Sequence, residues 1–130
     1  MGTNTLLNRL LLRKARPERD LEDFRNGVGF TVSALLQRIE DIGGRGAVAG
    51  GRLILTQGEP VTWRGPGGPM QLTGPFELHE TGGRVPVFGH FAKCLLSTGQ
   101  GDFELSVPRL DLDLVRLALA TGPAEPVRPQ

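Results

Sequence analysis

The chain has 130 residues, with 15 Lys and Arg against 14 Asp and Glu, so its formal net charge is +1. This length fits one domain, and a charge near zero provides no overall field that would favour nucleic acid as a partner. The single cysteine, Cys94, excludes an internal disulfide and is typical of a reducing compartment. Since no run of about 18 apolar residues occurs, we expect a cytoplasmic protein without a membrane span.

The first predicted element is an amphipathic helix over residues 3–16. Its apolar residues recur at helical spacing and are Leu6, Leu7, Leu10 and Leu11. Its charged residues are all basic and are Arg9, Arg13, Lys14 and Arg16. One interpretation is a helix that binds anionic lipid or an acidic partner. The other is a helix that packs on its own domain or on a second copy, with its basic side chains in solvent.

Residues 17–42 are predicted to form one bent helix or two short ones. Pro17 suits a first helical turn, and acidic residues follow it where the helix dipole favours them. Gly27 and Gly29 weaken the helix, so the chain bends there or the helix ends and restarts. Beyond them an apolar stripe continues at helical spacing, formed by Val32, Leu35, Leu36, Ile39 and Ile42.

From residue 44 onward, short apolar runs alternate with turns, and the chain as a whole holds 19 Gly and 10 Pro. This pattern predicts about seven short antiparallel strands, spaced about 8 to 12 residues apart. The expected strands cover residues 52–56, 60–64, 70–72, 76–79, 85–88, 91–96 and 103–107, and the small residues 46–49 are a candidate for one more. The last two are predicted to form a hairpin across a glycine-containing turn.

A C-terminal helix is predicted over residues 108–120, because a proline opens this segment and Gly122 and Pro123 follow it. The apolar face of this helix would be Leu110, Leu114, Leu117 and Ala118. Residues 110–114 also alternate between Leu and Asp, so an edge strand remains the alternative.

Residues that often carry chemistry are few in this chain. His79, Glu80, His90 and Cys94 lack the paired short spacings of a zinc site. Cys94 lies in an apolar run, where we expect a buried and inert thiol. The glycine-rich run over residues 43–51 lacks the Lys-Ser/Thr ending of a phosphate loop. We therefore expect no catalytic, cofactor-binding or metal-binding residue and no enzyme activity.

The order of the predicted elements, many short strands and then one amphipathic helix, resembles a pleckstrin-homology-like barrel. Residues 76–120 further resemble an actinobacterial family of unknown function with that fold. The shared features are Cys94 in an apolar strand, a glycine turn, the run Phe103-Glu104-Leu105, and a helix with Asp113-Leu114 and Leu117 to Leu119. The resemblance covers about residues 44–120. That family typically opens with a membrane-spanning helix, from which this chain departs, and it offers no functional residues to carry over.

The predicted fold class is α+β, with N-terminal helices followed by a small antiparallel β-barrel or sandwich, pleckstrin-homology-like, that a C-terminal helix caps. Its segments would be a helical part over residues 1–43, the β domain with its C-terminal helix over residues 44–122, and a disordered tail over residues 123–130.

The function that this fold favours is a non-enzymatic protein-interaction or adaptor module, as a subunit of a larger assembly. It would bind a partner protein or self-associate through the N-terminal helices, without a cofactor. The alternative is a peripheral module that binds an anionic membrane through the basic first helix. The candidate interaction surface is Arg9, Arg13, Lys14, Arg16, Arg45, Arg52 and Arg64.

Overall fold

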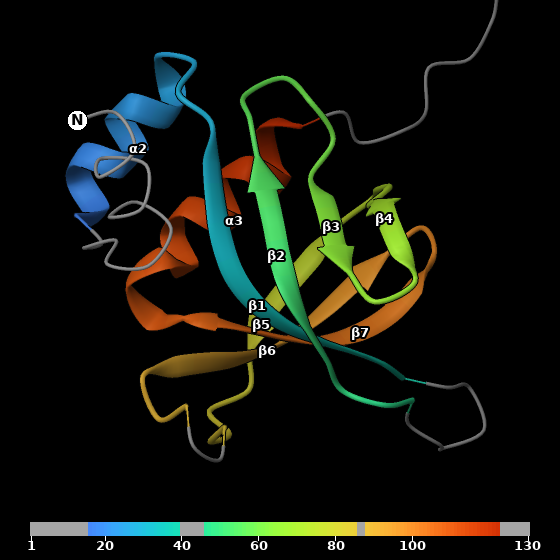
Figure 1. The fold of residues 1–130 in the computed structure, drawn as a ribbon. Helices are drawn as coiled ribbons and strands as arrows, with labels where there is room; N and C mark the ends of the chain where they lie inside the picture. The colour runs from blue at the N-terminus through green and yellow to red at the C-terminus, as the bar shows by residue number, and fades with distance from the viewer. Residues whose placement is uncertain (1–15, 40–45, 86–87, 123–130) are drawn as a thin grey trace, which may run out of the picture.

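The computed structural model describes residues 16–39, 46–85 and 88–122. These residues form an α+β fold, an open antiparallel sheet of seven strands with a helix after the last strand (Figure 1). The strands are β1 (Phe30–Arg38), β2 (Ala49–Leu55), β3 (Thr62–Gly65), β4 (Gly68–Gln71), β5 (Glu77–Glu80), β6 (Phe91–Thr98) and β7 (Gly101–Pro108). The helices are α2 (Pro17–Arg25), the short 3₁₀ turn η1 (Arg109–Asp111) and α3 (Leu112–Thr121).

The sheet has the strand order β4-β3-β2-β1-β7-β6-β5. Strands that are neighbours in sequence are therefore neighbours in the sheet, except for β4 and β5. The first and the last strand pair at the centre of the sheet, with Leu36 opposite Leu105. The two edges are β4 and β5. A two-residue turn joins β6 to β7, and Gly101 after it has φ +116°, a conformation that glycine adopts without strain.

The strand β1 corrects the predicted helix over residues 17–42. Among the described residues 17–39, only residues 17–25 are helical, and the chain turns at Gly27, where φ is +94°. After the turn, Val32, Ala34 and Leu36 alternate with more exposed residues, which is the period of a strand. The segment expected to be a separate helical part thus supplies a central strand of the sheet. The predicted first helix lies outside the described residues.

The two faces of the sheet differ in what covers them. On the face that we call inner, alternate residues of every long strand join α3 in one apolar core, with Phe24 of α2. Figure 1 shows α3 lying against this face with α2 beside it, and the two helices are in contact. Trp63, the only tryptophan of the sequence, is buried in the core. We call the opposite face, which α3 does not cover, the outer face.

The predicted C-terminal helix is confirmed, but part of its apolar face is not as expected. Leu114 and Ala118 are buried, whereas Leu110 is 59% exposed and Leu117 is only partly buried. The reason is that β7 continues to Pro108 and η1 follows it, so the helical turns begin at Leu112. The buried side of α3 is Leu112, Leu114, Val115, Ala118 and Leu119.

Side-chain hydrogen bonds hold the β6–β7 turn against the chain that follows β4. The Gln100 side chain accepts from the Thr73 amide at 3.0 Å and donates to the Gln71 carbonyl at 2.8 Å. The Gly99 amide donates to the Thr73 carbonyl at 2.7 Å. These contacts bring one edge of the sheet against a hairpin from its other half, so the sheet is strongly curved (Figure 1).

Candidate functional site

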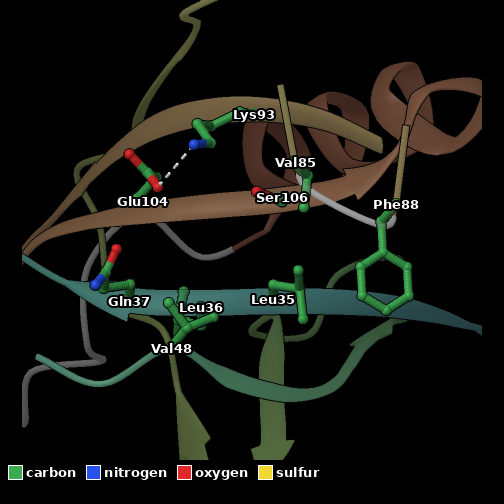
Figure 2. A pocket seen from close by; sticks show the side chains of 9 residues that line it. All are labelled: Leu35, Leu36, Gln37, Val48, Val85, Phe88, Lys93, Glu104 and Ser106. Atoms are coloured by element: carbon green, nitrogen blue, oxygen red, sulfur yellow. Dashed lines mark ion pairs between the residues drawn. The ribbon is translucent and has the colours of Figure 1, made fainter. Parts of the chain in front are cut away.

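A groove of about 290 Å³ lies on the outer face, where β1, β7 and β6 run side by side. Its lining combines outward side chains of these strands with residues just before β2 and in the segment before β6 (Figure 2). The lining residues are Leu35, Leu36, Gln37, Val48, Val85, Phe88, Lys93, Glu104 and Ser106.

The polar end of the groove is internally paired. Lys93 Nζ lies 3.6 Å from Glu104 Oε1, and both side chains are at most a quarter exposed. Gln37 Nε2 donates to the Gly46 carbonyl at 2.7 Å. Since these side chains are tied to neighbours, this end of the groove presents a fixed arrangement of charge and amide groups.

Ser106 is the exception among the polar lining residues. It is 4% exposed, and its hydroxyl makes no hydrogen bond with any residue that the structure describes. Within the same residues, no side-chain nitrogen or oxygen that is sealed from solvent lacks a partner. The Ser106 oxygen must therefore keep contact with solvent, and the groove that it lines provides this contact. It is a free donor and acceptor at the base of a mostly apolar groove.

Two exposed apolar side chains flank the groove. Val48 is 59% exposed and Phe88 is 40% exposed. Backbone hydrogen bonds from the Phe88 amide to the Val85 carbonyl and from the Phe91 amide to the Phe88 carbonyl position the Phe88 ring. Among large hydrophobic residues in the described ranges, only Leu110 is comparably exposed, and it belongs to η1 and does not line the groove. Exposed apolar side chains gathered at a hollow mark an interaction site better than scattered ones do.

Of the predicted interaction residues, the structure brings Arg52 and Arg64 together. They are direct partners in the β2–β3 ladder, both are exposed, and Ser33 continues their row on β1. Neither arginine forms an ion pair with the described part of the chain. Arg16 is exposed just before α2, away from this pair in the fold, and its backbone amide donates to Asp20 at 3.2 Å. Arg9, Arg13, Lys14 and Arg45 lie outside the described residues.

The residues considered for metal or thiol chemistry do not converge. His79 and His90 are exposed, and His90 packs edge-on against Phe91 at 4.7 Å between ring centroids. Glu80 is paired with Arg109 at 2.6 Å. Within the described ranges no group of three His, Cys, Asp or Glu side chains is placed to hold a metal.

Cys94 is buried, as predicted from its apolar run. Burial raises the pKa of its thiol, and the Glu80 carboxylate raises this pKa further, while Arg116 and Arg109 act in the opposite direction. A thiol with a raised pKa is mostly protonated at neutral pH and is a poor nucleophile.

The groove was missed by sequence reasoning because its base is built on β1, which was assigned to a helix. Ser106 alternates with the apolar residues Leu105 and Val107, so it was expected on the outward face of an ordinary half-buried strand. No described helix is long and apolar enough to cross a membrane. Comparison of the chain with protein-family models, with curated proteins and with solved structures finds no match.

Proposed function

We propose that this chain is a non-enzymatic protein-interaction module that binds a short segment of a partner protein in the outer-face groove. The observation that carries the proposal is the combination of two exposed apolar side chains, Val48 and Phe88, with the hydroxyl of Ser106, which no described residue hydrogen-bonds. An apolar side chain of the partner would fill the groove, and a backbone amide or carbonyl would pair with Ser106.

The size of the groove supports a peptide rather than a cofactor. Its volume of about 290 Å³ lies at the lower limit of small-molecule sites, which are about 300–1,000 Å³. One or two side chains fill such a space. Burying one Leu-sized side chain contributes about 1.5–3 kcal/mol, so the bound segment needs further contacts to reach even micromolar affinity. This magnitude suits a transient, regulated interaction.

The edges of the sheet are less suited to a partner strand. In β4, Pro69 lacks a donor and the strand is only four residues long. At β5, Arg116 donates to the Leu78 carbonyl at 3.4 Å and Arg109 pairs with Glu80. Since both edges are short or occupied, strand addition is less favourable than the groove.

We further propose that the fold is of the pleckstrin-homology-like kind. Support comes from the seven antiparallel strands in near-sequential order, the strong curvature of the sheet and the α3 helix that covers its inner face. By analogy with other modules of this shape, the role that we propose is an adaptor within a larger cytoplasmic assembly.

A random peptide display library, selected on the full chain, tests the proposed function. We expect enrichment of peptides with one bulky apolar residue, and their binding should be lost in Val48→Asp and in Phe88→Asp. Fluorescence anisotropy with the selected peptides measures this loss. Leu110→Asp is the matched control, because Leu110 has the same 59% exposure as Val48 but does not line the groove.

Two results would overturn the proposal. One is that the selected peptides bind Val48→Asp and Phe88→Asp as tightly as the unchanged chain. The other is a dimer in light scattering that dissociates on Val48→Asp, because a second copy would then occupy the groove. Thermal melts of each variant verify that the fold persists, which exposed positions should allow.

A further inference from the structure

The cross-strand pair Arg52–Arg64 places two like charges directly opposite each other on the outer face. Such a pair is unfavourable for the sheet itself, because opposed side chains have Cβ atoms only about 5 Å apart. Within the described residues no acidic side chain compensates either charge. The neighbours in the same row are Ser33 on β1 and Pro69 on β4, which are uncharged. The pair is therefore a site of unbalanced positive charge that an external anion would stabilise.

This arginine pair and the groove share one continuous surface. Along β2, Gly50 and Arg52 both point to the outer face, and Val48 at the groove immediately precedes this strand. Gly50 is paired with Leu35, a lining residue of the groove. Because Gly50 has no side chain, nothing on β2 separates the groove from the guanidinium groups.

From this arrangement we propose that the bound partner segment is acidic, with a carboxylate or phosphate group that Arg52 and Arg64 bind while its apolar residue fills the groove. This inference rests on the proposed function and names the chemistry of the partner. Residues on one face of a strand advance by about 7 Å per pair, so Arg52 lies about 14 Å along β2 from Val48. An extended segment advances by about 3.3–3.6 Å per residue, so its backbone spans this distance in about four positions. Arginine side chains that reach toward the groove shorten the spacing, so we expect the acidic residue about two to four positions from the apolar one.

A protein segment is favoured over an anionic membrane by the shape of the site. The apolar contacts are Val48 and Phe88 at the sides of a groove, and the paired charges of Lys93 and Glu104 line the same groove. A membrane surface needs protruding apolar and basic side chains around a convex patch. An extended peptide with one apolar and one acidic side chain can contact both the groove and the pair Arg52–Arg64.

Parallel selections from the same peptide display library test the inference. One selection uses the unchanged chain and the other uses Arg52→Gln/Arg64→Gln. We expect the unchanged chain to enrich Asp or Glu two to four positions from the apolar residue, and the double variant to lose this preference while keeping the apolar residue. For a selected peptide, each single Arg→Gln change should weaken binding about two- to fivefold.

Three comparisons sharpen the measurement. Arg25→Gln removes the same charge from an exposed position on α2, so it should leave affinity nearly unchanged. Gly50→Val places a side chain between groove and arginines, where a Cβ meets only Leu35 Cδ2 at an ordinary 3.7 Å. It should reduce binding of the acidic peptide to the level of its Ala-substituted form.

Synthetic peptides with Glu, phosphoserine or Ala at the acidic position separate carboxylate from phosphate recognition, and the Glu and phosphoserine forms should lose affinity in high salt.

Equal enrichment of acidic residues on the unchanged chain and on the double variant would overturn the inference while leaving the groove proposal intact. Absence of any peptide that requires Val48 and Phe88 would instead overturn the proposed function itself. Vesicles of phosphatidylserine and phosphatidylcholine provide the remaining arm. Sedimentation with these vesicles that depends on Arg52 and Arg64, without preference for acidic peptides, would show that the anion is a lipid headgroup and would also overturn the inference.

Discussion

The inner and outer faces of this sheet are built by the same strands but differ in almost every physical respect. Along β2, Gly51 and Leu53 point inward, whereas Gly50 and Arg52 point outward. The inward residues contact the core, whereas the outward ones run from the groove to the pair Arg52–Arg64, which forms no ion pair with the described part of the chain. One residue of sequence thus separates positions that stabilise the fold from positions available to a partner. Substitutions at neighbouring positions can measure how complete this separation is.

The largest effect is expected in α3, which covers the inner face. Leu114→Ala should reduce the free energy of unfolding by about 2–5 kcal/mol, because this buried side chain leaves a cavity. Leu117→Ala should cost clearly less, and Leu110→Ala about 0.5 kcal/mol or less, because Leu110 is mostly exposed. Urea titrations of the three variants measure these differences. A tolerant Leu114 with a sensitive Leu110 would contradict the helix phase described here.

Two adjacent glycines on β2 provide the next test. A Cβ at Gly51 would lie 2.7 Å from Trp63 Cη2 and too close to the Arg64 carbonyl oxygen. Gly51→Ala should therefore destabilise the fold by about 1–3 kcal/mol. Gly50→Ala adds only an ordinary contact and should be neutral or stabilising by about 0.4–1 kcal/mol. Thermal melts compare the two, and equal effects would show that both positions are equally crowded.

The rate at which a thiol reagent labels Cys94 measures how well the inner face is closed to solvent. We expect slow labelling by a thiol reagent in native buffer and fast labelling in denaturant, because the side chain is fully buried. Its folded-state pKa is raised, so the thiol contributes stability below the unfolded pKa and loses this contribution as pH rises toward the folded value. Cys94→Val should flatten this alkaline decline. Prompt labelling in native buffer would contradict the burial of β6.

The smallest expected effect concerns the outer face. Arg64→Thr removes the like-charge pair and places a good strand former on β3, so it should raise the free energy of unfolding by about 0.2–1 kcal/mol. Arg25→Thr on α2 is the control and should not stabilise. Denaturant titration at low salt measures both. A loss of stability in Arg64→Thr would mean that the arginine pair stabilises the sheet. It would contradict the view that the opposed charges are unfavourable until an anion binds.

Elements with strong local signals were predicted well. The C-terminal helix follows from its flanking Pro and Gly residues. The β6–β7 hairpin follows from an apolar run before a glycine turn and an alternating run after it. The burial of Cys94 follows from the apolar residues on both sides of it. Each of these signals lies within a few residues in sequence, so the sequence alone is sufficient.

The strand β1 could not be predicted in the same way. Val32, Leu35, Leu36 and Ile39 fit a helix, while Val32, Ala34 and Leu36 fit a strand equally well. What decides is pairing with β2 on one side and with β7, about 70 residues later, on the other. The candidate site had the same limitation. Arg52 and Arg64 were recognised as basic residues of interest, but their adjacency depends on the β2–β3 register, and the groove depends on β1.

The pairing of β1 with β7 also has a consequence for how the chain is made. Residues 35–38 must wait for residues 103–106 before the centre of the sheet can close, so most of the chain must leave the ribosome first. Until then β1 is an apolar strand whose β7-facing side is unpaired, and such an open edge can pair with other chains. A nascent chain halted before β7 should therefore depend on chaperones, whereas one halted after α3 should not.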